Sequence, residues 1–235
     1  MIDAAFPFGA VYRAFIAGGE IGTMRFWLVL ALAATIGPAN VALAGNLVVE
    51  VRDAAGRPVI DAVATLKPLD AASAPPARFA WPAAMAQHDI RFDPYVLIVP
   101  VGAEVRFPNR DRVRHHVYSF SPAKTFQLKL YGQDETRSVV FDRVGVVPLG
   151  CNIHDQMIGF VDVVDTPWAA KTDVSGEAVL QGVPAGRAQL TLWHPEMKAP
   201  RNQQILAVVV PAAGAHQAVT VVMGPPLRRT PHTAG

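Results

Sequence analysis

Turns interrupt this chain at short intervals, and their spacing constrains the fold more than any other feature. Beyond residue 44 no apolar pattern with a helical period persists, whereas short runs rich in valine, isoleucine, leucine and aromatic residues recur. Glycine, proline, asparagine and aspartate separate these runs, and those residue types favour turns. The pattern predicts an all-β protein.

The expected strands fall into three groups along the chain. Ranges 47–52 and 59–66 form the first group, and a proline-rich stretch at 67–84, which cannot hold a ladder of hydrogen bonds, follows it. The second group comprises 96–99, 104–107, 116–120, 126–131, 138–141 and 158–164. Short strands at this spacing fit one small sandwich or barrel. The third group comprises 178–180, 188–193, 204–210 and 218–223.

The first 44 residues read as a targeting segment rather than as part of the fold. Met24-Arg25 precedes an apolar run and then Ala42-Leu43-Ala44, which is typical of a secretory signal peptide over 24–44 cleaved after Ala44. A membrane anchor is the alternative. Residues 1–23 read as a start-site extension, and the proline-containing tail at 225–235 is expected to be disordered. The mature chain is therefore expected to be periplasmic, with no membrane contact.

Cys151 is the single cysteine of the chain, and an unpaired thiol in an exported protein needs a reason. It could be buried and inert, could pair with another chain, or could bind a metal. His154 and Met157 follow it at intervals of three residues, and His115-His116 lies upstream. A thiolate, two imidazoles and a thioether are the ligands of blue copper sites. Zinc is a chemical rival for cysteine and histidine, but the thioether argues against it.

Residues 87–164 resemble plastocyanin and amicyanin, and most closely the cupredoxin-like methylamine utilization protein group. The motifs that carry the resemblance are Phe92-x-Pro94, Val101-Gly102 and Val105-x-Phe107-x-Asn109-x-Asp111. The resemblance implies a Greek-key cupredoxin sandwich over 85–165. It also implies that one copper ion, cycling between Cu(I) and Cu(II), is held by His115, Cys151, His154 and Met157. His116 stands where the family usually has asparagine, and Ile153 where proline is common, so His115 and His116 remain alternatives for the first ligand.

The segments on either side resemble a different family. Val51 to Val59, Thr172 to Gly176 and Gly182 to Gly186 are similar to carboxypeptidase-regulatory-like, or transthyretin-like, β-sandwiches. Neither segment has enough strands to bury a core alone. We expect 46–80 and 167–224 to form one discontinuous sandwich into which the cupredoxin is inserted. Two strands decorating the edge of the cupredoxin are the alternative.

Composition excludes several functions. A formal net charge of +2 with 17% charged residues is too balanced for a nucleic-acid-binding face. No Ser/His/Asp set, carboxylate pair or phosphate loop stands out, so the chain is not expected to be an enzyme. The expected function is that of a periplasmic mononuclear type 1 copper protein, acting as a one-electron carrier or redox relay. Its partner would be a redox protein such as a cytochrome or dehydrogenase.

Two other functions remain open: an envelope copper-binding or copper-handling protein without electron transfer, and a structural β protein with a vestigial site. Arg110, Arg112 and Arg114, just before His115, would form a basic rim for the redox partner, or only a solvated face.

Overall fold

The computed structural model describes residues 44–70 and 74–227, and these ranges fall within one compact unit, Val41–Gly235. The predicted start-site extension, the signal peptide before Ala44 and residues 228–235 of the predicted tail lie outside the described residues. Strands account for the regular structure of the described ranges, apart from one 3-10 turn at Pro200–Asn202, so the all-β prediction is confirmed. None of the helical structure in these ranges is long and apolar enough to span a membrane.

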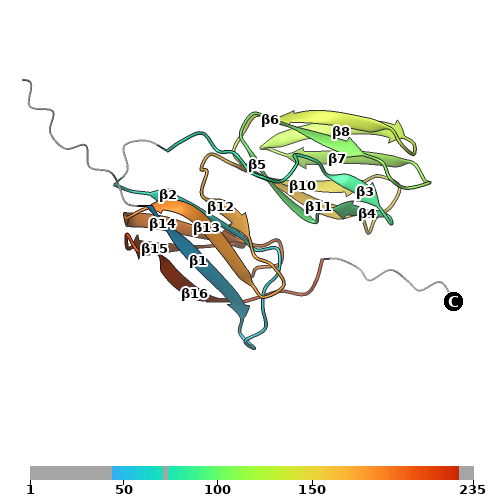
Figure 1. Ribbon diagram of the computed structural model, residues 1–235. Coiled ribbons are helices and arrows are strands. Elements are labelled where there is room, and N and C mark those ends of the chain that lie inside the picture. The colour runs from blue at the N-terminus through green and yellow to red at the C-terminus, as the bar shows by residue number, and fades with distance from the viewer. Residues whose placement is uncertain (1–43, 71–73, 228–235) are drawn as a thin grey trace, which may run out of the picture. The chain divides into compact units, whose positions relative to one another are not determined.

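The strands at the two ends of the described chain share two sheets (Figure 1). One sheet has the order β13-β1-β16, with bounds Glu177–Pro184, Ala44–Asp53 and Ala215–Val221. The other has the order β12-β2-β14-β15, with bounds Ala169–Lys171, Val63–Pro68, Gly186–Trp193 and Gln203–Val210. One buried apolar cluster contains residues from both sheets, so the segments before and after the middle of the chain form one sandwich.

Successive side chains of β14 alternate between the two faces of the four-stranded sheet. Ala188, Leu190 and Leu192 are buried in the core between its two sheets. Because successive side chains of a strand point to opposite faces, Gln189 and Thr191 project away from that core. The four-stranded sheet therefore has an apolar inner face, whereas its outer face carries polar side chains such as Gln189 and Thr191 together with apolar ones such as Val63 and Trp193.

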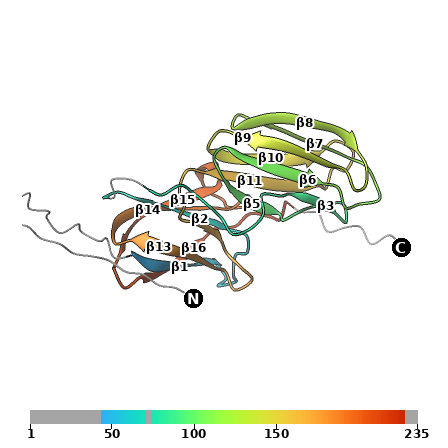
Figure 2. The same cartoon turned by 45° about the horizontal axis from the view of Figure 1, so that its top comes forward.

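The middle of the chain forms a second sandwich, whose layers can be followed in Figure 2. Its five-stranded sheet has the order β5-β11-β10-β7-β8, with bounds Val96–Pro100, Ile158–Val164, Gly145–Cys151, His115–Ser121 and Lys124–Tyr131. Two further pairs are β6-β9, at Ala103–Pro108 and Thr136–Phe141, and β3-β4, at Ala86–His88 and Arg91–Asp93. Phe107 and Phe141 from β6-β9 pack with Val117, Val147 and Val161 of the larger sheet in one buried core.

A third apolar cluster joins the two sandwiches. It contains Val63, Ala169 and Trp193 from the first sandwich, and Tyr95, Val96, Ile98, Phe160 and Val164 from the second. Strands β3, β4 and β12 were not expected from the sequence, because three residues are too few to show an alternating pattern. Strand β10 was not expected either, because Gly145, Pro148 and Gly150 within it argue against a strand.

The fold places the candidate ligands at one end of the five-stranded sheet. His115 is the first residue of β7 and Cys151 is the last residue of β10, and these antiparallel strands pair through Cys151 and Val117. Residues 152–157 connect β10 to β11 and carry His154 and Met157. Pairing of distant strands therefore brings the upstream histidine beside the cysteine.

Candidate metal centre

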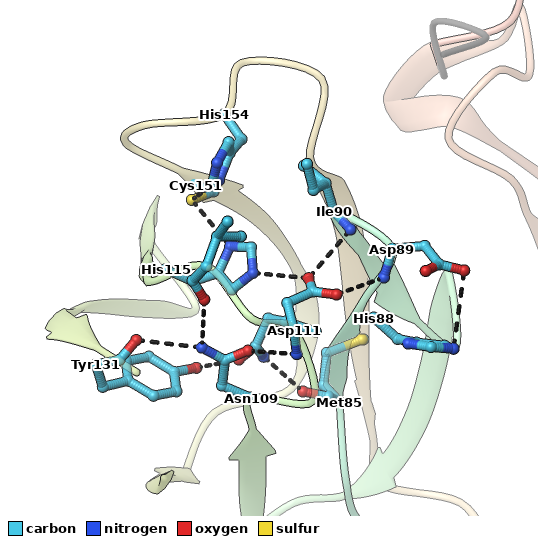
Figure 3. Close-up of polar contacts among 12 residues, drawn as sticks. Met85, His88, Asp89, Ile90, Asn109, Asp111, His115, Tyr131, Cys151 and His154 are labelled. Atoms are coloured by element: carbon cyan, nitrogen blue, oxygen red, sulfur yellow. Dashed lines mark hydrogen bonds and ion pairs between the residues drawn. The ribbon is translucent and has the colours of Figure 1, made fainter. Parts of the chain in front are cut away.

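Three of the four predicted ligands converge in the structure. The Nδ1 atoms of His115 and His154 lie 3.8 Å and 3.5 Å from the Sγ of Cys151, and the candidate ligand atoms of the three residues all lie within 4.8 Å of one another. Figure 3 shows the two imidazoles on either side of the sulfur. The imidazole rings are 5.0 Å apart between centroids.

These separations fit a single small metal ion. Metal–nitrogen and metal–sulfur bonds of about 2.0 and 2.3 Å, at angles between tetrahedral and trigonal, place the sulfur and nitrogen atoms about 3.5 to 3.7 Å apart. The two observed distances, 3.5 and 3.8 Å, are close to that span. One thiolate and two imidazoles are also the in-plane ligand set of type 1 copper. The residues present therefore fit copper in both spacing and donor chemistry.

Met157, the predicted axial ligand, is buried beside the same site. It is 1% exposed, belongs to the same core cluster as Cys151, and lines the same surface groove. Its backbone N–H donates to the carbonyl of His154 at 2.9 Å, which closes the connection between β10 and β11 into a tight turn. The fold thus holds the thioether residue next to the thiol through a short and ordered loop.

His115 rather than His116 faces the thiol. His115 is fully buried, whereas His116, the next residue of β7, is only half-buried, because adjacent strand residues project to opposite faces. His116 contributes through its backbone: its carbonyl accepts the N–H of Asn152 at 3.0 Å, and its N–H stabilises the thiolate of Cys151.

The thiol of Cys151 is poised to ionise. Burial alone raises its pKa, but hydrogen bonds outweigh that effect and lower the pKa to about 6. The largest of them comes from His115, followed by the backbone N–H groups of residues 116 and 153 and by His154. A thiolate is the form that binds metals, so the protein presents the cysteine as a ligand at neutral pH.

Asp111 orients the first imidazole from behind. The Nε2 of His115 lies 2.8 Å from an oxygen of the Asp111 carboxylate, so Nε2–H donates to that carboxylate. Nδ1, which is hydrogen-bonded to Cys151 in the metal-free protein, is then the ring nitrogen that would bind a metal. Burial lowers the pKa of His115, but hydrogen bonds and charge interactions with Cys151 and Asp111 outweigh burial and raise it.

The same carboxylate also fixes the turn between β3 and β4. Its two oxygens accept the backbone N–H groups of Asp89 at 2.7 Å and Ile90 at 3.1 Å (Figure 3). Asp111 is itself held by Asn109, whose side-chain oxygen accepts the Asp111 N–H at 2.8 Å. His88, Asp89 and Asp111 form another group of potential ligands, but the Asp111 carboxylate is already engaged with His115 and with this turn.

From the sequence, Asp111 was expected only as part of a family motif, with no function of its own. The signal was present, because Asn109-x-Asp111 stands four residues before His115. Its meaning depends on the bend at 111–113, which turns the carboxylate back onto the ring. That bend also means that Arg110, Arg112 and Arg114 are not on an extended strand, although all three are exposed.

Gly150 leaves room for an aromatic ring next to the ligand cysteine. A Cβ atom at this position would lie 2.8 Å from the ring and hydroxyl of Tyr118 on the neighbouring strand. Tyr118 in turn packs against Phe120, with ring centroids 5.1 Å apart. The absence of a side chain at residue 150 therefore lets a tyrosine from β7 cover the strand that carries the thiol.

Comparisons with known proteins give partial structural likeness only. No family model and no curated protein match the chain. A purple cupredoxin from Nitrosopumilus maritimus is 24% identical, with 34% of this chain and 98% of that chain covered and a TM-score of 0.32. A reduced amicyanin mutant is 23% identical, with 43% and 98% covered and a TM-score of 0.33.

A copper-containing nitrite reductase from Thermus scotoductus SA-01 is 25% identical, with 42% of this chain and 25% of that chain covered and a TM-score of 0.34. Each match covers less than half of this chain at a low TM-score, so the case for a metal centre rests on the geometry of the site.

Proposed function

We propose that this chain is a periplasmic type 1 copper protein of the cupredoxin kind, which carries single electrons between redox proteins. The observation that carries the proposal is the buried Cys151 thiol with the Nδ1 atoms of His115 and His154 at 3.8 and 3.5 Å. Met157 would supply the weak axial thioether. Copper bound there supplies one-electron exchange between Cu(I) and Cu(II).

The protein's own groups suit that function. Cys151 and His115 are 3% and 0% exposed, so water is excluded from the thiolate and from one imidazole. Hydrogen bonds to Asp111 and to backbone N–H groups hold these side chains before any metal arrives, which keeps structural change small during electron exchange. His154 is the exception: it lies on the connecting loop and is half-buried, so its ring is the proposed exit for the electron.

The proposed redox partner is an acidic protein, such as a cytochrome or dehydrogenase. The exposed arginines at 110, 112 and 114 lie just before His115 in the chain. Charges of one sign near the exit would speed encounter with a partner of opposite charge. Electron exchange with an acidic cytochrome should then slow as salt is raised, and a rate that does not depend on salt would remove this part of the proposal.

The test of the copper site is an optical and EPR spectrum of the full mature chain loaded with Cu(II). We expect an intense thiolate-to-copper absorption band in the visible region. Cys151→Ser should abolish the band, and His116→Asn serves as the matched control that should retain it. Loss of the band in the control, or no band in the unmodified protein, would contradict the assigned ligands.

A second measurement separates electron transfer from copper storage or delivery. Both functions predict the same spectrum, because both use the same ligands. A reversible potential with rapid self-exchange supports the electron carrier. Slow self-exchange, combined with release of copper to a chelator or acceptor protein, would favour the copper-handling alternative.

A further inference from the structure

A carboxylate is buried in the contact between the two sandwiches. Asp162 lies in the middle of β11, in the run Phe160-Val161-Asp162-Val163-Val164. Val161 and Val163 belong to the core of the second sandwich, so the alternation of β11 sends Phe160, Asp162 and Val164 to the opposite face.

That face is apolar, and Asp162 has no polar partner on it. Phe160 and Val164 belong to the cluster between the sandwiches, as does Ile98, the cross-strand neighbour of Asp162 on β5. Within the described ranges the Asp162 carboxylate makes no hydrogen bond or ion pair, although it is only 7% exposed. An unpaired buried carboxylate is costly, and such a group in a folded protein calls for a missing partner.

The carboxylate opens onto a cavity of about 670 Å³. Besides Asp162, its wall includes Phe160 from β11 and Trp193 from β14, whose ring centroids lie 5.5 Å apart in an edge-to-face arrangement. Thr65 and Thr191, which pair across β2 and β14, form the polar side of the cavity. Cavities of this size, mostly apolar with a few polar groups, are typical of small-molecule sites.

The remaining charges of the lining define which ligand fits. Lys67 is paired with Asp165 at 2.9 Å, and both side chains are exposed, so this pair adds no net charge. Arg201 also lines the cavity, but it is exposed to solvent. The buried, unpaired charge of the lining is therefore that of Asp162, and two buried aromatic rings and two half-buried threonine hydroxyls line the same cavity.

We infer that this cavity binds a small organic ammonium ion, whose charged nitrogen sits at Asp162 and whose apolar part lies against Phe160 and Trp193. An ammonium group donates hydrogen bonds to a carboxylate and to hydroxyls, and aromatic faces attract organic cations. A metal ion fits less well, because hard cations need several oxygen ligands and Asp162 is the one carboxylate of the lining that is not paired with a cation. The inference does not depend on copper, since the cavity and the metal centre use different residues.

The test is isothermal titration of the full mature chain with 2-phenylethylammonium chloride at neutral pH in phosphate buffer. We expect saturable binding in the micromolar to millimolar range. The neutral analogue 2-phenylethanol should bind at least about tenfold more weakly, because it lacks the charge. Asp162→Asn should weaken ammonium binding by at least about tenfold, whereas the control Asp165→Asn, which removes an exposed carboxylate of the same lining, should stay within about twofold.

Several results would overturn the inference. They are no saturable binding of the ammonium probe, equal binding of the alcohol, equal weakening by both variants, and a tighter response to Ca²⁺ than to the probe. L-Phenylalanine carries the same ring and ammonium group as the amine, together with a carboxylate. If it binds as tightly as the amine, Arg201 of the lining is the partner of that carboxylate. The copper spectrum should be the same in both variants, so failure of this site and failure of the copper site are distinguishable.

Discussion

Replacing Asp162 with asparagine tests whether the buried carboxylate also lacks a hydrogen-bond or ion-pair partner in solution. Burial raises the pKa of Asp162 from 3.8 to about 6. The folded protein therefore holds this proton more tightly than the unfolded chain does, and ionisation disfavours folding. The resulting loss of stability is absent below the unfolded pKa, develops as the pH rises from about 4 to about 6, and is constant above that.

The magnitude follows from the shift in pKa. At about 1.36 kcal/mol per pH unit, the change from 3.8 to about 6 corresponds to about 3 kcal/mol of lost stability at neutral pH. Asparagine has nearly the same shape and does not titrate. The variant should therefore gain stability over the unmodified protein as the pH rises: the difference between their free energies of unfolding should grow by about 2 to 3 kcal/mol from about pH 4 to about pH 8.

Urea unfolding of the metal-free protein and of the variant, at several pH values across this range, measures the difference directly. Amine buffers must be avoided, because a bound ammonium ion would stabilise the ionised carboxylate and reduce the difference. A difference in stability that stays constant with pH would refute the reasoning, because it would show that Asp162 has an ordinary pKa and hence a partner in solution. Asp165→Asn, at an exposed position, should show no comparable change.

Three further predictions concern the metal centre. In the metal-free protein the thiolate absorbance of Cys151 should titrate with a midpoint near pH 6, against an ordinary pKa of 9.0, and a midpoint above 8 would contradict the hydrogen bonds described. Asp111→Asn should weaken copper binding by about 10- to 100-fold in a chelator competition, because it loosens the orientation of His115; unchanged affinity would mean that the carboxylate only fixes the turn. Gly150→Ala should lower the free energy of unfolding by about 1 to 3 kcal/mol in urea, because the new methyl group displaces Tyr118, and an unchanged value would show that the ring moves freely.

The sequence predicted the all-β class and much of the candidate metal centre. Cys151, His154 and Met157 are close in the chain, so one short loop between strands is enough to bring them together. Turn residues and apolar runs are likewise local signals, which explains why most strands were expected near their observed places. Strands of three residues were missed, since alternation cannot be seen over so short a range. Strand β10, which ends at Cys151, was missed because it contains Gly145, Pro148 and Gly150.

Only the tertiary structure distinguished His115 from His116. The two residues are chemically identical, and the distinction depends on which face of β7 each one occupies once Cys151 of β10 has paired beside Val117. Asp111 acquires its part in the site in the same way, because a bend in the chain directs its carboxylate onto the ring of His115.

The sequence alone thus determined which chemistry this protein can hold, because ligand type and local spacing are properties of residues near one another in the chain. It could not show that Asp162 lacks a partner, since a charged residue in a strand is usually solvated. Only packing of the two sandwiches turned the face of β11 that carries Asp162 away from water and opened a cavity in front of it. Burial and the contacts between distant strands arise from the whole fold, and no local pattern encodes them.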